Sequence, residues 1–338
     1  MPRPTRDYDP EWMLVARSRS LRVRARRHAV GRTIDGAFSG LARTSRWVPV
    51  TWPRFHGVER LRNVSYGPHR AHRLDVWRPV KRSGPLPVVL YVHGGAFRSL
   101  SKDTHWLMGL AFARSGYVVF NIDYRLAPRF KFPAAPADAC RAYAWVVEHA
   151  AEYGGDSQKL VLAGESAGGN LVTTLAVAAS YDRPEVWTLP VRESGVMPSA
   201  VLPMCGMLQV SDPERFARAG PLSQLDADAL FSCSGDYLPD HIGSGARAAD
   251  LADPLCVLER GDVPVRALPP FYAAAGTKDP LLADSRRLGI SLRRLGVHSV
   301  IEEYPGEVHA FHALIWRSAA RSCWKAQISF LDEVFSGV

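Results

Sequence analysis

Residues 160–174 read LVLAGESAGGNLVTT, and they hold the most informative motif of the chain. The apolar run Leu160–Ala163 predicts a strand buried on both faces, and a helical pattern follows over Ala167–Ser180. Between them, Gly164–Gly168 matches G-x-S-x-G in the strand–turn–helix setting of a nucleophile elbow. Such a turn lifts the hydroxyl of Ser166 to a helix N-terminus, whose dipole favours developing negative charge. The alternative is an ordinary strand–helix turn with a capping serine.

Segments typical of strands and of helices alternate along the chain after about residue 57. Strands are expected at Val58–Tyr66, His72–Arg78, Pro87–His93, Tyr117–Tyr124, Leu160–Ala163, Ala200–Leu208, Phe271–Ala275 and Ser299–Tyr304. Helices are expected at Thr104–Ser115, Pro136–Tyr153, Ala167–Ser180, Leu281–Leu295 and from about Ala313 to Phe335. The alternation predicts an α/β fold with a mostly parallel sheet and helices on both faces. The first two strands are expected to form an antiparallel edge pair.

The chain has 338 residues and a formal net charge of +9, which is unevenly distributed. Residues 1–50 hold eleven arginines against four acidic side chains, which leaves only +2 on the rest. No apolar run approaches the roughly 20 residues of a membrane-spanning helix, and no signal-peptide apolar segment follows the basic N-terminus. The five widely spaced cysteines indicate neither a disulfide framework nor a zinc site. We therefore expect a cytoplasmic protein.

The arginine-rich segment raises the question of a partner. It contains an amphipathic stretch, Pro10–Ala37, which could attach to an anionic membrane surface and make the protein membrane-peripheral. No recognisable nucleic-acid motif is present, so specific nucleic-acid binding is not expected. The alternative is that these arginines form the solvated outer face of helices. A homodimer is a further assembly that the sequence leaves open.

A second glycine-rich motif, His93–Phe97 (HGGAF), directly follows one of the expected strands. Adjacent glycines let backbone N–H groups approach a substrate oxygen, which is how an oxyanion hole is built. We assign Gly94 and Gly95 as donors, with the N–H of Ala167 as the third. The alternative is a glycine-rich turn that only reverses the chain.

A nucleophilic serine needs a histidine base, and the base needs an orienting carboxylate. In this architecture the order along the chain is serine, acid, histidine. Asp279 and His309 each follow an expected strand, so both belong to the sheet edge that carries the elbow. His312 is the competitor, three residues further on. His298 precedes its strand and would emerge at the opposite edge.

Together these motifs resemble the hormone-sensitive-lipase family of α/β-hydrolases, which includes bacterial esterases and arylacetamide-deacetylase-like enzymes. The matching segments are HGGAF at His93–Phe97, DYRLAPR at Asp123–Arg129, FPAA at Phe132–Ala135, GESAGGN at Gly164–Asn170, DPLLAD at Asp279–Asp284 and HAF at His309–Phe311. The resemblance covers about residues 58–335, and its H-G-F pattern favours His309 over His312. It implies an α/β-hydrolase fold with a catalytic domain over 58–338. Residues 1–57 and an insertion within 211–268, which reads as short helices and loops, would form a helical cap.

The resemblance implies a serine carboxylesterase that hydrolyses carboxylic esters with short to medium acyl chains. Ser166 would attack the carbonyl, His309 would carry the proton, and Asp279 would orient the imidazole. No metal ion or organic cofactor is implied, and the expected partner is a small-molecule ester. The alternatives are an amidase or deacetylase with the same triad, and a non-catalytic ligand-binding member of the fold, which would lack the histidine.

Three positions depart from the family pattern. Ala96 replaces the third glycine and adds a methyl group beside the oxyanion loop. Glu165 is longer than the usual aspartate, and Arg129 reverses the charge of the usual glutamate. We expect Ala96, Phe97 and Glu165 to contribute to substrate binding.

Overall fold

A computed structural model describes residues 40, 52–219, 223–240, 242 and 247–337. The arginine-rich segment 1–50, with its expected roles in a cap or at a membrane, therefore lies outside the described residues except for residue 40. Within the described part, no helix is both long enough and apolar enough to cross a membrane.

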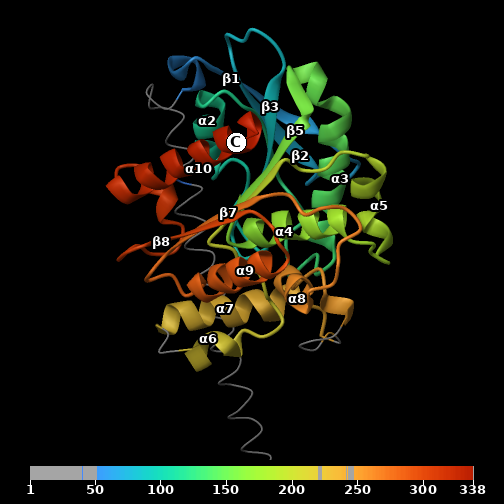
Figure 1. Cartoon of the computed structure of the whole chain (residues 1–338), viewed down its shortest axis with the longest axis vertical. Helices are drawn as coiled ribbons and strands as arrows, with labels where there is room; N and C mark the ends of the chain where they lie inside the picture. Colours follow the sequence, from blue (N-terminus) through green and yellow to red (C-terminus); the bar gives the residue numbers. More distant parts are fainter. Residues whose placement is uncertain (1–39, 41–51, 220–222, 241, 243–246, 338) are drawn as a thin grey trace, which may run out of the picture.

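An eight-stranded sheet runs through the molecule in the order β1-β2-β4-β3-β5-β6-β7-β8 (Figure 1). The strands are β1 (Val58–Ser65), β2 (Arg73–Pro79), β3 (Leu86–Val92), β4 (Val118–Ile122), β5 (Gly155–Glu165), β6 (Ala200–Met204), β7 (Phe271–Gly276) and β8 (Ser299–Tyr304). β2 pairs antiparallel with both β1 and β4, whereas the strands from β4 to β8 in this order pair parallel. The predicted mostly parallel sheet is confirmed. Its parallel strands end at one common edge.

Two strands differ from the predicted length by four residues or more. β5 starts at Gly155, ahead of its apolar run, because its first residues pair with the start of β3. β6 ends at Met204 instead of Leu208, because the chain turns at Cys205, whose φ is +39°. The buried carboxylate of Asp284 holds the following loop by accepting the N–H of Leu208 at 2.9 Å. A side chain from a later helix thus overrides the strand propensity of this apolar segment.

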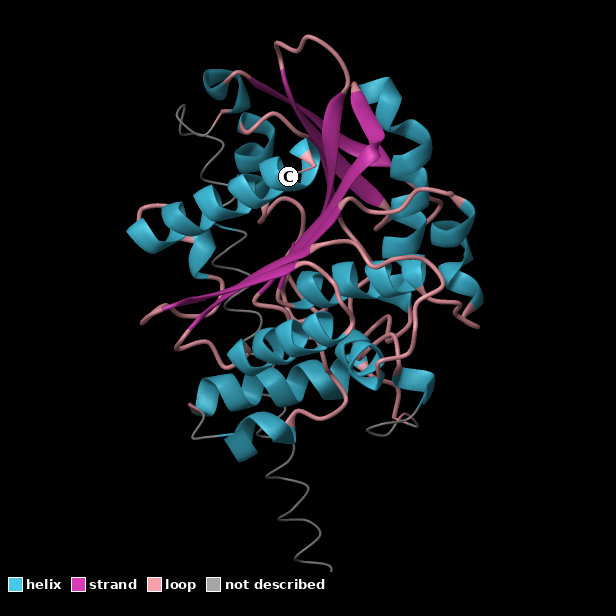
Figure 2. Cartoon of the chain, in the orientation of Figure 1, coloured by secondary structure: helices cyan, strands magenta, loops and turns pink. Residues whose placement is uncertain are grey.

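Helices cover both faces of the sheet (Figure 2). One face carries α2 (Trp106–Arg114) and α10 (Ser318–Ser336); the other carries α3 (Ala134–His149), α4 (Ala167–Ser180), α5 (Leu189–Glu193), α8 (Pro254–Arg260) and α9 (Leu282–Arg294). Each face has its own apolar core, with Phe112 and Phe330 on one side and Leu171 and Leu288 on the other. Every residue of α4 is buried, because it packs on the sheet beneath neighbouring helices. The helix that follows Ser166 is therefore held rigidly.

Between β6 and β7 the chain forms α6 (Glu214–Ala219), α7 (Gln224–Tyr237), the short 3-10 helix η6 (Arg247–Ala249) and α8. α6 and α7 lie at the lower end of the view in Figure 1. The ring of Tyr237 in α7 stacks on Phe97, with centroids 3.8 Å apart. Arg215 of α6 forms an ion pair with Asp284 of α9 at 2.6 Å. The role of part of residues 211–268 as a cap stays a prediction.

A buried carboxylate explains what the segment Asp123–Arg129 does for the fold. Asp138 of α3 is 1% exposed. Its oxygens accept hydrogen bonds from the backbone and guanidinium of Arg125, the shortest at 2.6 Å. His72 Nε2 lies 2.9 Å from the same carboxylate. The chain after β4, the start of β2 and helix α3 are thereby joined at one point.

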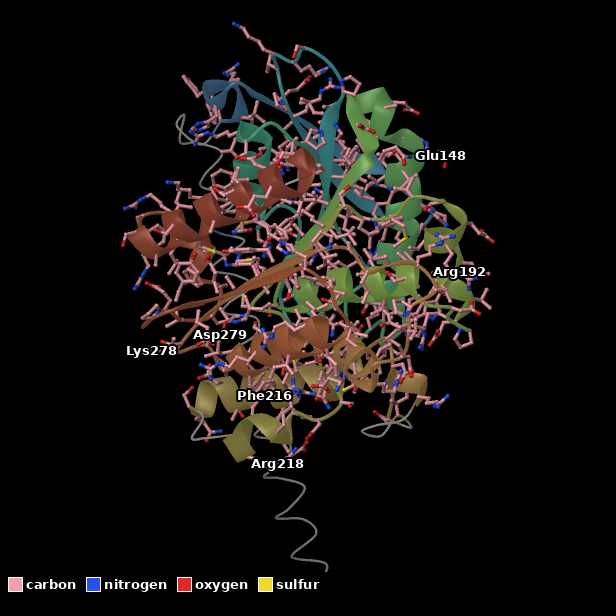
Figure 3. All side chains as sticks on the ribbon, viewed as in Figure 1. Glu148, Arg192, Phe216, Arg218, Lys278 and Asp279 are labelled. Atoms are coloured by element: carbon pink, nitrogen blue, oxygen red, sulfur yellow. The ribbon has the colours of Figure 1, made fainter. Side chains whose placement is uncertain are left out.

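We predict that Asp138→Ala lowers the free energy of unfolding by about 3 kcal/mol or more, because it leaves Arg125 without its counter-charge and the buried ring of His72 without its hydrogen-bond partner. Urea denaturation followed by circular dichroism measures the change. Glu148→Gln, at an exposed position of the same helix (Figure 3), is the matched control and should change stability by less than about 0.5 kcal/mol. Equal stability of Asp138→Ala and the wild type would contradict the prediction.

Candidate active site

The elbow places Ser166 between β5 and α4 in a strained backbone conformation. Its φ of +54° and ψ of −115° are values that residues with a side chain rarely adopt. A Cβ on Gly164 would lie 2.7 Å from the carbonyl oxygen of Val92, and one on Gly168 would overlap the same oxygen. The N–H of Ser166 donates to the carbonyl of Met204 at 2.9 Å, which fixes the turn to the end of β6. Glycine on both sides therefore permits the turn that exposes the serine.

Asp279 and His309 come together beyond the ends of β7 and β8. His309 Nδ1 donates to Asp279 Oδ2 over 2.9 Å. The Asp279 side chain is fully buried, and its other oxygen accepts the N–H of Leu281 at 2.8 Å. The His309 ring remains 37% exposed. Because Nδ1 carries the proton toward Asp279, Nε2 is the basic nitrogen of the neutral ring.

Backbone hydrogen bonds join the two loops that carry this pair. The N–H of Thr277 donates to the carbonyl of Tyr304, and the N–H of Lys278 donates to the carbonyl of Glu307, each at 2.9 Å. Lys278 and Asp279 are labelled side by side in Figure 3. The relative position of Asp279 and its histidine therefore rests on the main chain as well as on their own bond.

The loop after β3 has two peptide groups of fixed orientation. The carbonyl of Gly94 accepts from Nδ1 of the buried His93 at 2.7 Å, so it points into the interior. Since C=O and N–H of a trans peptide point in opposite directions, the N–H of Gly95 is directed away from that interior. The Gly95 carbonyl accepts the N–H groups of Arg98 and Ser99. The N–H of Ala96 belongs to the same peptide group as this carbonyl and therefore points in the opposite direction to it. Ala167 is the first residue of α4, so its N–H has no acceptor within the helix.

The three residues expected to contact substrate lie in different surroundings. Ala96 is half-buried and has a φ of +52°. Phe97 is fully buried against Tyr237, and Glu165 is 7% exposed. Neither of these two side chains is open to a ligand in this structure. Substrate contact by Ala96, Phe97 and Glu165 stays a prediction.

The competing histidines lie apart from Asp279. His312 Nε2 is 2.8 Å from Glu165 Oε2, and the residue is buried. His298 stacks on Phe330, with ring centroids 5.7 Å apart. Among the described histidines, the hydrogen bond with Asp279 is made by His309.

Cys205 is a residue of this site that the motifs did not indicate. Its sulfur, a carboxylate oxygen of Asp279 and an imidazole nitrogen of His309 lie within 4.8 Å of one another. Burial raises the pKa of the Cys205 thiol, which keeps it neutral. The sequence feature that could have indicated Cys205 is its position directly after β6, at the sheet edge where the elbow lies.

The same three groups are donors that a thiophilic divalent cation accepts. His309 Nδ1 and Asp279 Oδ2 already bind each other at 2.9 Å, so a cation using these atoms would have to replace that hydrogen bond. The geometry of the pair is that of an oriented base.

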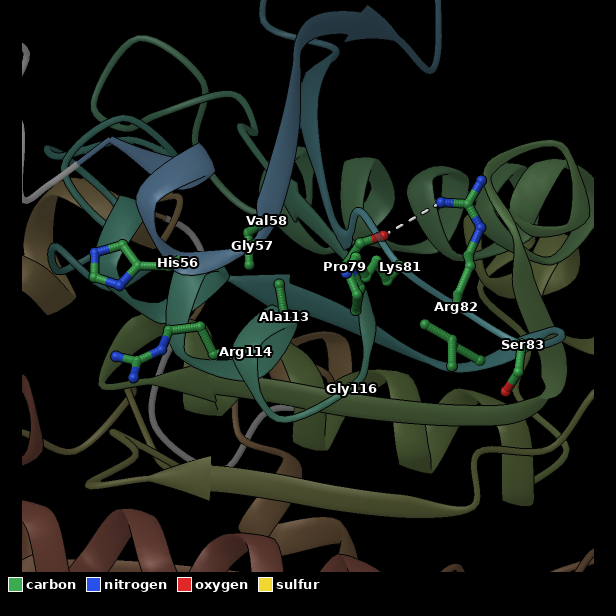
Figure 4. Close-up of a pocket in the computed structure, with 11 residues that line it drawn as sticks. His56, Gly57, Val58, Pro79, Lys81, Arg82, Ser83, Ala113, Arg114 and Gly116 are labelled. Atoms are coloured by element: carbon green, nitrogen blue, oxygen red, sulfur yellow. Dashed lines mark hydrogen bonds between the residues drawn. The ribbon is translucent and has the colours of Figure 1, made fainter.

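A hollow of about 600 Å³ lies at the other edge of the sheet (Figure 4). It is lined by residues at the start of β1, the end of β2 and the start of β3, together with Arg114 and Gly116 before β4. Parallel strands begin at this edge and end at the edge of Ser166. The hollow is therefore separate from the candidate active site.

Known proteins resemble the chain over most of its length. A family model described as alpha/beta hydrolase fold matches residues 89–313. The carboxylesterase NlhH of Mycobacterium tuberculosis is 30% identical over 302 residues, covering 81% of this chain and 89% of the relative. The versiconal hemiacetal acetate esterase of Dothistroma septosporum is 25% identical over 285 residues, covering 84% and 82%. A solved esterase structure from Pyrobaculum calidifontis has a TM-score of 0.65 at 26% identity, covering 90% and 92%.

The fold and the matched relatives define an α/β-hydrolase that acts as a carboxylic ester hydrolase. The chain belongs to the hormone-sensitive-lipase family of that fold.

The pKa of His309 provides a test of the site. Partial burial of the ring lowers this pKa, whereas the ionised carboxylate of Asp279, hydrogen-bonded to Nδ1, raises it, and the balance lies above the ordinary value of 6.5. A general base must be neutral, so activity should be present above the raised pKa and lost as the pH falls through it. We predict that the acid limb of kcat/KM for p-nitrophenyl acetate has its midpoint above pH 6.5. A midpoint at or below pH 6.5 would contradict the raised pKa.

Proposed function

We propose that the chain is a serine carboxylesterase in which Ser166 is the nucleophile, His309 the general base and Asp279 its orienting carboxylate. The observation that carries the proposal is the 2.9 Å bond between Asp279 and His309, at the sheet edge where the strained elbow presents the serine. A serine on a strained turn, with an oriented imidazole on a neighbouring loop, is the arrangement that acyl transfer requires.

Contacts through Cys205 support the proximity of the serine and the histidine. Ser166 is hydrogen-bonded through its N–H to Met204, the residue before Cys205. The sulfur of Cys205 is within 4.8 Å of the nearest donor atom of His309. Two consecutive residues at the end of β6, Met204 and Cys205, therefore lie beside Ser166 and His309 respectively.

In the proposed reaction, Ser166 Oγ attacks the ester carbonyl while His309 Nε2 takes the hydroxyl proton. The tetrahedral intermediate collapses to an acyl-enzyme, and the same imidazole gives its proton to the departing alcohol. A water molecule, deprotonated by His309, then attacks the acyl-enzyme and releases the acid. Asp279 stays ionised throughout and stabilises the imidazolium that forms in each half-reaction.

The oxyanion would be held by the N–H groups of Gly94, Gly95 and Ala167. The peptide orientation of Gly95 and the unpaired helical position of Ala167 support this assignment. The N–H of Ala96 is the next donor along the same loop. One such donor is typically worth about 10²–10³ in kcat.

We also propose that the acyl chains are short to medium in length. The methyl group of Ala96 would narrow the space for the acyl group, because it lies on the loop beside the scissile carbonyl. Behind it, the stacked rings of Phe97 and Tyr237 fill the space between this loop and α7. Cys233 of α7 also contacts the carbonyl of Ala96, at 3.5 Å. The relative from Dothistroma septosporum is named as an acetate esterase, which agrees with a small acyl group.

We predict that Ser166→Ala abolishes hydrolysis of p-nitrophenyl butyrate and labelling by a fluorophosphonate, because the substitution removes the proposed nucleophile. The melting temperature should stay close to that of the wild type, since the hydroxyl is replaced on a half-buried residue. Ser115→Ala, at an exposed helix end, is the matched control and should retain full turnover. Residual turnover or labelling above the uncatalysed rate in Ser166→Ala would reject the assignment.

A series of p-nitrophenyl esters from acetate to palmitate tests the acyl limit. The highest kcat/KM should fall between acetate and octanoate, and palmitate should be poorer by about tenfold or more, because its chain does not fit the filled space behind the loop. A rise in kcat/KM continuing to palmitate would contradict the short acyl site. The matched p-nitroanilides, compared in the same assay, test whether amides are the better substrates.

A further inference from the structure

The carboxylate of Glu165 lies beneath the candidate active site between two histidines. His105 Nε2 is 2.8 Å from Oε1, and His312 Nε2 is 2.8 Å from Oε2. All three residues are at most 7% exposed. An ionised side chain so far from water is costly unless charged partners compensate it. An imidazole nitrogen faces each carboxylate oxygen, and the one of His105 makes a hydrogen bond there.

Three catalytic segments meet at Glu165, while its other partner, His105, lies at the start of α2. Glu165 itself directly precedes the nucleophile Ser166. His312 is three residues after the general base, in the short helix η7 (Phe311–Ala313). The oxyanion loop is the third segment, because a Cβ on Gly94 would lie 3.2 Å from Glu165 Cγ. The side chain therefore touches the nucleophile strand, the base loop and the oxyanion loop at once.

We propose that Glu165 is a positioning residue that clamps these three segments in register for catalysis. This inference rests on the proposed function. It also gives a use to the departure from the family's aspartate, because the extra methylene of glutamate extends the carboxylate to imidazoles that come from two separate parts of the chain. The triad bond between Asp279 and His309 orients the imidazole ring. The clamp would set the distance of that ring from the serine.

Electrostatics agree with a charged clamp. Burial by itself raises the pKa of Glu165, but His105 and His312 hold it well below its usual range, so the carboxylate is ionised. Both ring nitrogens of His105 face oxygen acceptors, Glu165 on one side and the carbonyl of Ser101 at 3.1 Å on the other. Burial lowers the pKa of the neighbouring His93 to about 3, so that ring is neutral and adds no charge to the cluster.

The test is Glu165→Gln, which keeps the length of the side chain and removes its charge. We expect kcat per active site, counted by titration with a fluorophosphonate, to fall about 10- to 100-fold with KM changed less than threefold, because small displacements of reacting groups slow the chemical step. Counting active sites distinguishes a slower reaction at each site from a loss of correctly folded protein. A purely structural role would reduce the number of titratable sites or the melting temperature and leave kcat per site intact.

Two further variants keep the inference falsifiable if Glu165→Gln folds poorly. His312→Gln breaks the link to the base loop alone and should lower kcat per site in the same way. Glu165→Asp retains the charge and should recover part of the loss. Glu148→Gln, which removes an exposed glutamate on α3, is the control expected to behave as the wild type.

The outcomes separate the clamp from the proposed function. Suppose that the wild type turns over ester and that Glu165→Gln and His312→Gln both keep kcat per site within twofold of the wild type. This result would overturn the clamp and leave the proposed function standing. A loss confined to KM would also overturn it and would point to direct substrate contact by Glu165. A wild-type protein with neither turnover nor titratable serine would overturn both the clamp and the proposed function.

Discussion

Close backbone contact at the elbow is the constraint on which the site depends. The carbonyl oxygen of Val92, at the end of β3, lies where a Cβ of Gly164 or Gly168 would have to be. With glycine at both positions, β3, β5 and the first turn of α4 approach one another without a side chain between them. The loop after β3 then runs directly beside Ser166. The proposed nucleophile and the proposed oxyanion donors can therefore be neighbours although they are about 70 residues apart in sequence.

Buried carboxylates hold the irregular segments that surround this contact. Asp284 and Asp253 accept backbone N–H groups of the loop after β6, at Leu208 and Val210. Asp279 does the same for Leu281 while it orients the histidine. Loops at this edge have no strand partners, so side-chain acceptors satisfy their backbone donors instead. Two of these carboxylates thereby hold the loop that follows β6, and the third holds the loop that carries the candidate catalytic acid.

The sheet and most of its helices could be predicted because their signals are local. Apolar runs, turn glycines and the alternation of segments located the eight strands, six of them within two residues of their observed bounds, whereas β5 begins five residues before its predicted start. The end of β6 was predicted too late, because the apolar residues up to Leu208 also suit a strand. Their turn at Cys205 is imposed by a carboxylate about 75 residues later. The helices within 211–268 were foreseen only as short and irregular, since their packing depends on contacts such as that of Tyr237 with Phe97.

The amino-acid sequence by itself determined the class of fold, the elbow serine and the order in which acid and histidine follow it. Those features depend on residue type and spacing along the chain, which short motifs record completely. Only the tertiary structure decided what surrounds them: that His312 faces Glu165, that Cys205 lies beside His309, and that Phe97 stacks on α7. These neighbours come from segments far apart in sequence. Their meeting depends on how strands and helices pack, which no local pattern contains.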